Sequence, residues 1–149
     1  MPSFEGGHVA IRMAVGVLLF AALAGGWEVL ARQAPGSVLY LGVMPEPIAA
    51  LRELATMLGL LLFAAGALMR WAFAGPPPRW VALGLYGGAL LSLAAQAYGA
   101  ARGMYGIQLQ DLRADAMPLF AAKHLGLLAF AAAFFELARR ILNRPPPSA

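Results

Sequence analysis

Cysteine, charge and histidine are all scarce in this chain of 149 residues. It has no cysteine, which excludes disulfides, thiolate-held metal sites and iron–sulfur clusters. Charged residues make up 12% of the chain, against about 25% in soluble domains. Hydrophobic residues make up 61%, and the mean hydropathy is +0.71. A water-soluble fold of this length could not cover so much apolar surface, so the composition indicates an integral membrane protein.

Four segments are long and apolar enough to cross a bilayer, which needs roughly 20 mainly apolar residues. They run over residues 9–30, 48–74, 80–101 and 116–142 and use most of the chain. The short link at residues 75–79 contains three prolines, which end a helix, and it makes the second and third spans antiparallel neighbours. The sequence therefore predicts one all-α domain, a four-transmembrane-helix bundle with both termini on the same side.

Two longer connectors, residues 31–47 and 103–115, join the other spans, and the first of them is unusually apolar. The basic residues divide six to five between the side of the termini and the side of these connectors. The positive-inside rule then places both termini in the cytoplasm, and we expect a bacterial inner (plasma) membrane. The basic residues form no stripe along a helix, so no nucleic-acid partner is expected.

Polar side chains from all four spans fall at one level, on the side of the long connectors, whereas the other side carries few. They are Glu28, Glu53, Gln96, Tyr98, Arg102, Lys123 and His124. Ionisable residues inside a span are costly and are usually paired or functional. Several interpretations stay open, and the first is a structural network in which Glu28 or Glu53 pairs with a cation. That cation would be Lys123 or Arg102.

The other interpretations give these residues a different role. One is a small-molecule pocket for a quinone or a lipid headgroup, with His124 as a hydrogen-bond donor. Another is a proton or ion path, and in the simplest case Lys123 only reaches the lipid headgroups. No catalytic residue is assigned under any of them.

Metal and haem sites can be judged from the two histidines, His8 and His124. His8 precedes the first span and His124 begins the fourth, so with four alternating spans they lie on opposite membrane faces. One chain cannot use them as a haem-ligand pair, and one imidazole with carboxylates is a poor transition-metal set. We therefore expect no metal site and no cofactor held by this chain alone. Two alternatives are left: a bound quinone, and a haem whose second ligand comes from another subunit.

Small residues recur every four positions in the third span, at Gly84, Gly88 and Ser92. Such spacing lets two helix backbones approach closely in lipid. The partner helix belongs either to the same bundle or to another subunit. The expected partners are accordingly membrane lipids, other integral membrane subunits and further copies of the chain.

The first half of the chain resembles the DoxX-like group of small four-helix membrane proteins. Arg12 and Gly16 open the first span, residues 41–47 (LGVMPEP) resemble the short element before that group's second span, and Gly59 and Gly66 lead to Arg70. The group carries an acidic residue just ahead of these glycines. This sequence departs from that pattern, because the position falls near Thr56 and Glu53 lies one turn earlier. The resemblance implies a small membrane subunit linked to quinone-coupled redox complexes or detoxification.

Three functions follow as expectations. The first is a non-catalytic accessory subunit of a larger membrane complex in electron transfer, for which an apolar connector could cover a partner. The second is a DoxX-like, quinone-linked membrane oxidoreductase component with its pocket among the seven polar residues. The third is a small dimeric transporter, although Glu28 lies too near the end of its span to serve as a mid-membrane carboxylate.

Overall fold

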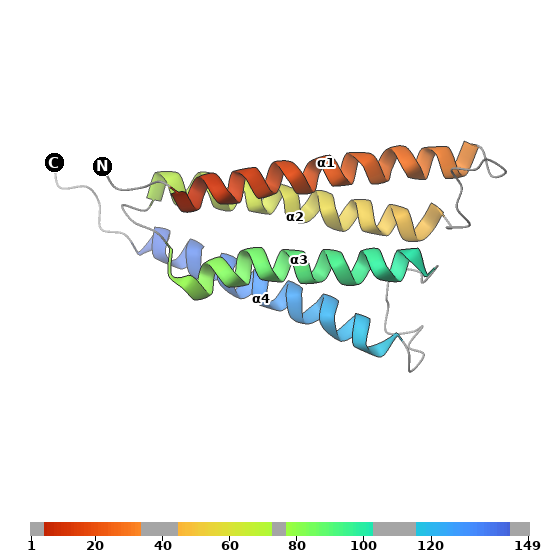
Figure 1. The fold of residues 1–149 in the computed structure, drawn as a ribbon. Helices are drawn as coiled ribbons and strands as arrows, with labels where there is room; N and C mark the ends of the chain where they lie inside the picture. Colours follow the sequence, from red (N-terminus) through yellow and green to blue (C-terminus); the bar gives the residue numbers. More distant parts are fainter. Residues whose placement is uncertain (1–4, 34–44, 73–76, 103–115, 144–149) are drawn as a thin grey trace.

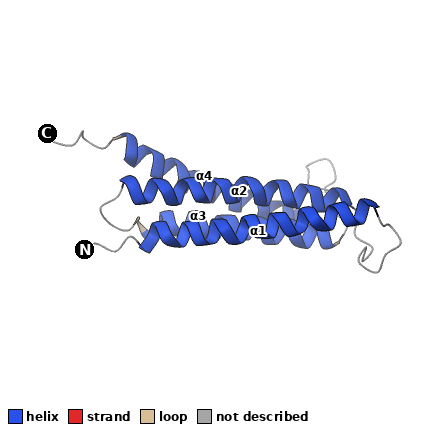
Figure 2. Cartoon of the chain, turned by 90° about the horizontal axis from the view of Figure 1, so that it is seen from above, coloured by secondary structure: helices blue, strands red, loops and turns tan. Residues whose placement is uncertain are grey.

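A computed structural model describes residues 5–33, 45–72, 77–102 and 116–143. These residues form four helices: α1 (Glu5–Gln33), α2 (Pro45–Ala72), α3 (Arg79–Ala101) and α4 (Met117–Leu142). Each is long and apolar enough to cross a membrane. Figure 1 shows them side by side with alternating direction, and Figure 2 shows the same bundle from above. The predicted all-α, four-helix membrane fold is confirmed.

The first two helices start earlier than the apolar segments alone indicate. The first begins at Glu5 rather than at residue 9, and the second at Pro45 rather than at residue 48. Pro45 and Pro47 therefore belong to the first turn of α2 instead of the connector before it. A proline is tolerated there because the first backbone N–H groups of a helix have no partner within the helix. Residues 34–44, most of the apolar connector, lie outside the described part.

The first two helices form one antiparallel pair. The buried positions of α1 alternate in steps of three and four, a seven-residue repeat typical of coiled coils. They are Gly7, Ala10, Ala14, Val17, Ala21, Ala24, Glu28 and Ala31. The same repeat runs along α2 through Ile48, Leu51, Ala55, Leu58, Leu62, Ala65 and Met69. Because the α1 positions are mostly alanine, the two backbones lie close together.

The last two helices form a second pair with still closer backbone contact. A Cβ atom on Gly84 would lie 2.7 Å from the Cβ atom of Ala133, and one on Gly88 would lie 2.5 Å from the carbonyl oxygen of Gly126. The two pairs meet mainly through α2 and α3, where Leu58, Leu62 and Leu85 are fully buried.

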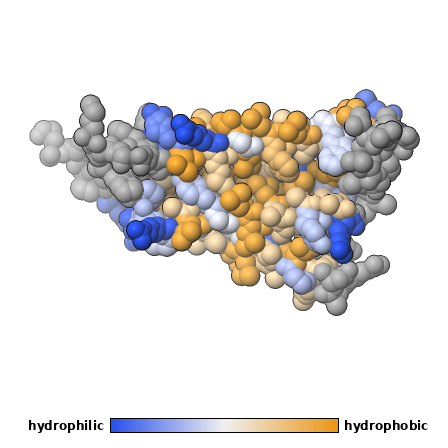
Figure 3. Space-filling model, viewed as in Figure 1, coloured by the Kyte–Doolittle hydropathy of each residue, from blue (hydrophilic) through white to orange (hydrophobic). Residues whose placement is uncertain are grey.

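The surface carries a band of apolar side chains between two more hydrophilic ends (Figure 3). Exposed leucines and phenylalanines, such as Leu23, Leu83 and Phe135, lie on it with 70–75% of their surface accessible. Such exposure is stable only in lipid. We name the two ends after the buried carboxylate that each contains. The Glu28 end holds the last turns of α1 and α3, and the Glu136 end holds the last turns of α2 and α4.

Candidate functional site

Glu28 is the buried acid of the polar residues predicted from the sequence, with 7% of its surface exposed. Arg32 Nε donates a hydrogen bond of 3.1 Å to its Oε1 atom, and Arg52 Nη1 lies 2.8 Å from its Oε2 atom. Arg52 comes from α2, so this ion pair joins the first two helices. Gly25 leaves room for the arginine, because a Cβ atom there would lie 3.2 Å from Arg52 Cδ.

The predicted pairing of Glu28 or Glu53 with Lys123 or Arg102 is therefore wrong. Glu28 pairs within its own hairpin, and Glu53 is exposed. Glu53 directly follows Arg52, and neighbours in a helix point about 100° apart, so only one of the two can face α1. Arg52 is the residue that the sequence interpretation missed. The signal was available, because Glu28 continues the seven-residue alanine repeat of α1 and so faces the next helix.

Gln96 is the most enclosed polar side chain at this end. It is 0% exposed, and neither its amide nitrogen Nε2 nor its amide oxygen Oε1 has a hydrogen-bond partner among the described residues. An unpaired buried polar group costs about 1–3 kcal/mol. A leucine would fill the same space without that cost. Within the described part of the chain, the amide of Gln96 therefore keeps one donor group and one acceptor without a partner.

One turn before Gln96, Ser92 connects α3 to α4. Its hydroxyl lies 2.9 Å from the carbonyl oxygens of both Gly88 and Lys123. A Cβ atom on Gly126 would overlap the Ser92 hydroxyl, so the missing side chain at 126 is what admits this contact. Gly84, Gly88 and Ser92 thus all lie on the face of α3 that packs against α4 of the same chain.

Lys123 and His124 both lie half-buried on α4. His124 Nδ1 lies 2.8 Å from the carbonyl oxygen of Phe120, one turn earlier, and the two rings lie 4.0 Å apart. These contacts hold the imidazole against its own helix. Its second ring nitrogen, Nε2, forms no hydrogen bond with the described residues.

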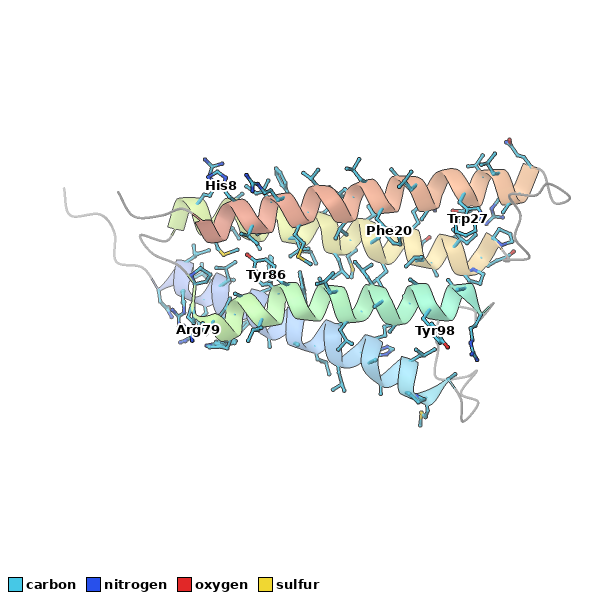
Figure 4. All side chains as sticks on the ribbon, in the orientation of Figure 1. His8, Phe20, Trp27, Arg79, Tyr86 and Tyr98 are labelled. Carbon is cyan, nitrogen blue, oxygen red and sulfur yellow. The ribbon has the colours of Figure 1, made fainter. Side chains whose placement is uncertain are left out.

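Tyr98 and Arg102 lie at the end of α3, where Figure 4 labels Tyr98. The Arg102 guanidinium sits 5.3 Å from the centre of the Tyr98 ring, a cation–π contact. Both residues are exposed. They belong to the membrane surface at the Glu28 end rather than to its interior.

The seven predicted residues therefore separate into groups. Glu28 lies between α1 and α2, Gln96 is enclosed, and the remaining five are half-buried or exposed. The first turns of α4 diverge from α3 at this end, as Figure 1 shows. Depth along the spans was readable from the sequence, but the direction of each side chain was not.

The opposite end of the bundle has a carboxylate cluster of its own, at Glu136. Glu136 accepts hydrogen bonds from Arg139 Nε at 2.7 Å, Arg139 Nη2 at 2.9 Å and Arg140 Nε at 2.7 Å. The spacing of three and four residues places these side chains next to one another on a helix. Each end of the bundle thus holds one buried glutamate between two arginines.

Among the described residues there is no group of three or more histidine, cysteine, aspartate or glutamate side chains that could hold a metal ion. His8 lies near the start of α1 and His124 near the start of α4, so the two histidines lie at opposite ends of the bundle. Figure 4 labels His8 at the end away from Tyr98.

Comparison of the chain with protein-family models, with curated proteins and with solved structures found no match.

Proposed function

We propose that this chain is a small non-catalytic membrane subunit of an electron-transfer complex, and that it binds a quinone or a similar lipophilic carbonyl compound beside Gln96. The membrane is the bacterial inner membrane, with the Glu136 end facing the cytoplasm. The more numerous arginines at that end support this orientation under the positive-inside rule.

The observation that carries the binding proposal is the unpaired amide of Gln96. Both polar atoms of this side chain are buried and receive no hydrogen bond from the described residues, which is unfavourable, and a ligand would supply the missing partners. The amide N–H group can donate to a ring carbonyl, and the amide oxygen can accept from a ring hydroxyl. A quinone and its reduced form offer these two groups on an apolar ring, which suits a site enclosed by apolar helices.

The electron-transfer context rests on the resemblance of residues 12–70 to the DoxX-like group, which stays a prediction. Gln96 lies in the second half of the chain, so the binding proposal is independent of that resemblance. The geometry also supports a binding role over a catalytic one. A neutral amide can orient a ligand by hydrogen bonds, but it does not take up or release a proton at neutral pH.

The test compares two leucine substitutions. Wild-type protein, Gln96→Leu and Gln33→Leu are purified in a mild detergent, the bound lipophilic compounds are extracted, and quinones are quantified by mass spectrometry. Gln33 is the matched control because it is exposed at the end of α1. We expect quinone with the wild type and with Gln33→Leu, and little with Gln96→Leu.

Two outcomes would contradict the proposal. If wild-type protein purified from quinone-containing membranes carries none, the ligand is wrong. If Gln96→Leu retains as much quinone as the wild type, the site is wrong. Subunits that co-purify with the wild type test the accessory role separately, and a chain that purifies alone from gently solubilised membranes would count against it.

A further inference from the structure

Every helix places at least one exposed arginine at the Glu136 end. These arginines are Arg12 of α1, Arg70 of α2, Arg79 of α3, and Arg139 and Arg140 of α4. The carboxylates in the same part of the sequence are Glu5 and Glu136. At the Glu28 end the charges of the described residues nearly balance. The basic residues there are Arg32, Arg52, Arg102 and Lys123, and the acidic residues are Glu28, Glu46 and Glu53. The Glu136 end is therefore the strongly positive end of the bundle.

Glu136 orders the two arginines of α4 without using all of their donors. Arg139 gives it Nε and Nη2, and Arg140 gives it Nε alone. Arg139 Nη1 and both terminal nitrogens of Arg140 make no other hydrogen bond with the described residues. One carboxylate thus holds two guanidinium groups in place and leaves one net positive charge. Charge-assisted bonds from such groups suit a phosphate.

The start of α3 lies at the same level as this cluster. Gly84 packs against Ala129 and Ala133, and the helices are antiparallel, so Arg79 lies level with Glu136 and the residues just after it. Figure 4 shows Arg79 at this end of α3. The first turn of α3 has no acidic residue, and its N-cap residue, Pro78, makes no side-chain hydrogen bond. The positive end of the α3 helix dipole and Arg79 thus lie at the same end of the bundle as Arg139 and Arg140.

We propose that Arg79, Arg139 and Arg140, the exposed arginines of α3 and α4 at this end, bind the phosphates of anionic phospholipid headgroups. The position of these arginines identifies the occupant, since they follow directly on apolar spans and therefore lie at headgroup depth. The neighbouring Trp80 is 51% exposed, as expected of an aromatic residue at the membrane interface. The acyl chains would lie along the apolar band that begins beside this end in Figure 3. This site is separate from Gln96 and does not depend on the proposed function.

The experiment measures lipid retention. Protein is reconstituted in bilayers of equal parts phosphatidylglycerol and phosphatidylcholine, and the lipids that stay bound after gentle detergent extraction are counted by native mass spectrometry. The test variant is Arg79→Gln/Arg140→Gln. The control variant, Arg32→Gln/Arg102→Gln, removes two exposed arginines at the opposite end. Far-UV circular dichroism and thermal unfolding verify that both variants are folded.

We expect the wild type and the control to retain phosphatidylglycerol in preference to phosphatidylcholine. One basic residue near an anionic surface changes the affinity for anionic lipid by a factor of roughly five. The test variant lacks two such residues, so its affinity for phosphatidylglycerol should fall roughly twenty-five-fold. High salt should weaken the wild-type preference, and inorganic phosphate added at the same ionic strength should not compete with the lipid.

Equal retention of both lipids by the wild type would overturn the proposal, and so would an equal loss of preference in the two variants. Competition by inorganic phosphate would assign the site to a free anion instead of a lipid. Loss of quinone at Gln96 with an intact lipid preference would leave this inference standing, because the two sites are tested by different readouts.

Discussion

Replacement of Gly88 by alanine tests whether close backbone contact holds α3 and α4 together. A Cβ atom at residue 88 would lie 2.5 Å from the carbonyl oxygen of Gly126 and 2.9 Å from the backbone nitrogen of Phe130. Both neighbours are backbone atoms, so no change of side-chain rotamer can relieve the overlap. The two helices must instead separate by about 1 Å to reach ordinary contact distances.

The magnitude follows from three contributions. Alanine is favoured over glycine inside a helix by about 0.5–1 kcal/mol. Overpacking of a tight interior costs about 1–3 kcal/mol. Separation of the helices also weakens the hydrogen bond from Ser92 to the Lys123 carbonyl oxygen, which contributes about 1 kcal/mol. Together they predict that Gly88→Ala lowers the free energy of unfolding by about 1–3 kcal/mol.

Gly87→Ala is the matched control, because a Cβ atom at residue 87 meets nothing within 4 Å. It should leave stability unchanged or raise it by up to about 1 kcal/mol through helix propensity alone. Equilibrium unfolding in mixed micelles with increasing sodium dodecyl sulfate, followed by circular dichroism, measures both variants. If Gly87→Ala and Gly88→Ala change stability equally, the close approach of α3 and α4 is not what stabilises the pair.

Two further substitutions probe single contacts by the same unfolding measurement. Glu28→Gln should lower the free energy of unfolding by about 1–2 kcal/mol, because Arg52 loses its buried partner but stays partly in contact with the headgroup region. The control is Glu53→Gln, which replaces an exposed residue and should change the free energy of unfolding little. An equal effect of the two substitutions would refute the role of the ion pair. Ser92→Ala should cost about 1 kcal/mol and speed amide hydrogen exchange in α4 but not in α1, whereas uniform acceleration would show that the contact with Lys123 is not local.

The ion pairs show where sequence reasoning succeeded and where it failed. The cluster at Glu136 was readable because its members are three and four residues apart on one helix, and helix geometry alone brings them together. The pairing of Glu28 was not read correctly. Its partner Arg52 lies on another helix, and the choice between Arg52, Arg102 and Lys123 depends on which helices are neighbours and how each is rotated.

Gln96 shows the same limit within a single helix. The sequence placed it near the end of the third span, level with other polar residues. Only the packed bundle shows that it is wholly enclosed and that no described side chain or backbone group bonds it, while Tyr98, two positions later, lies outside. A step of two residues turns a helix by about 200°, so similar depth does not mean a similar environment.

The sequence by itself determined that the chain is a four-helix membrane protein, because span length and apolar composition follow directly from the thickness of the bilayer. The spacing of Gly84, Gly88 and Ser92 also indicated the packing face of α3, since a helix repeats its face with a fixed period. The tertiary structure alone decided that the helices pack as two hairpins, that Glu28 is bound by Arg52, and that Gln96 has no partner among the described residues. These features depend on the rotation of each helix about its axis, which is set by contacts between residues far apart in the chain.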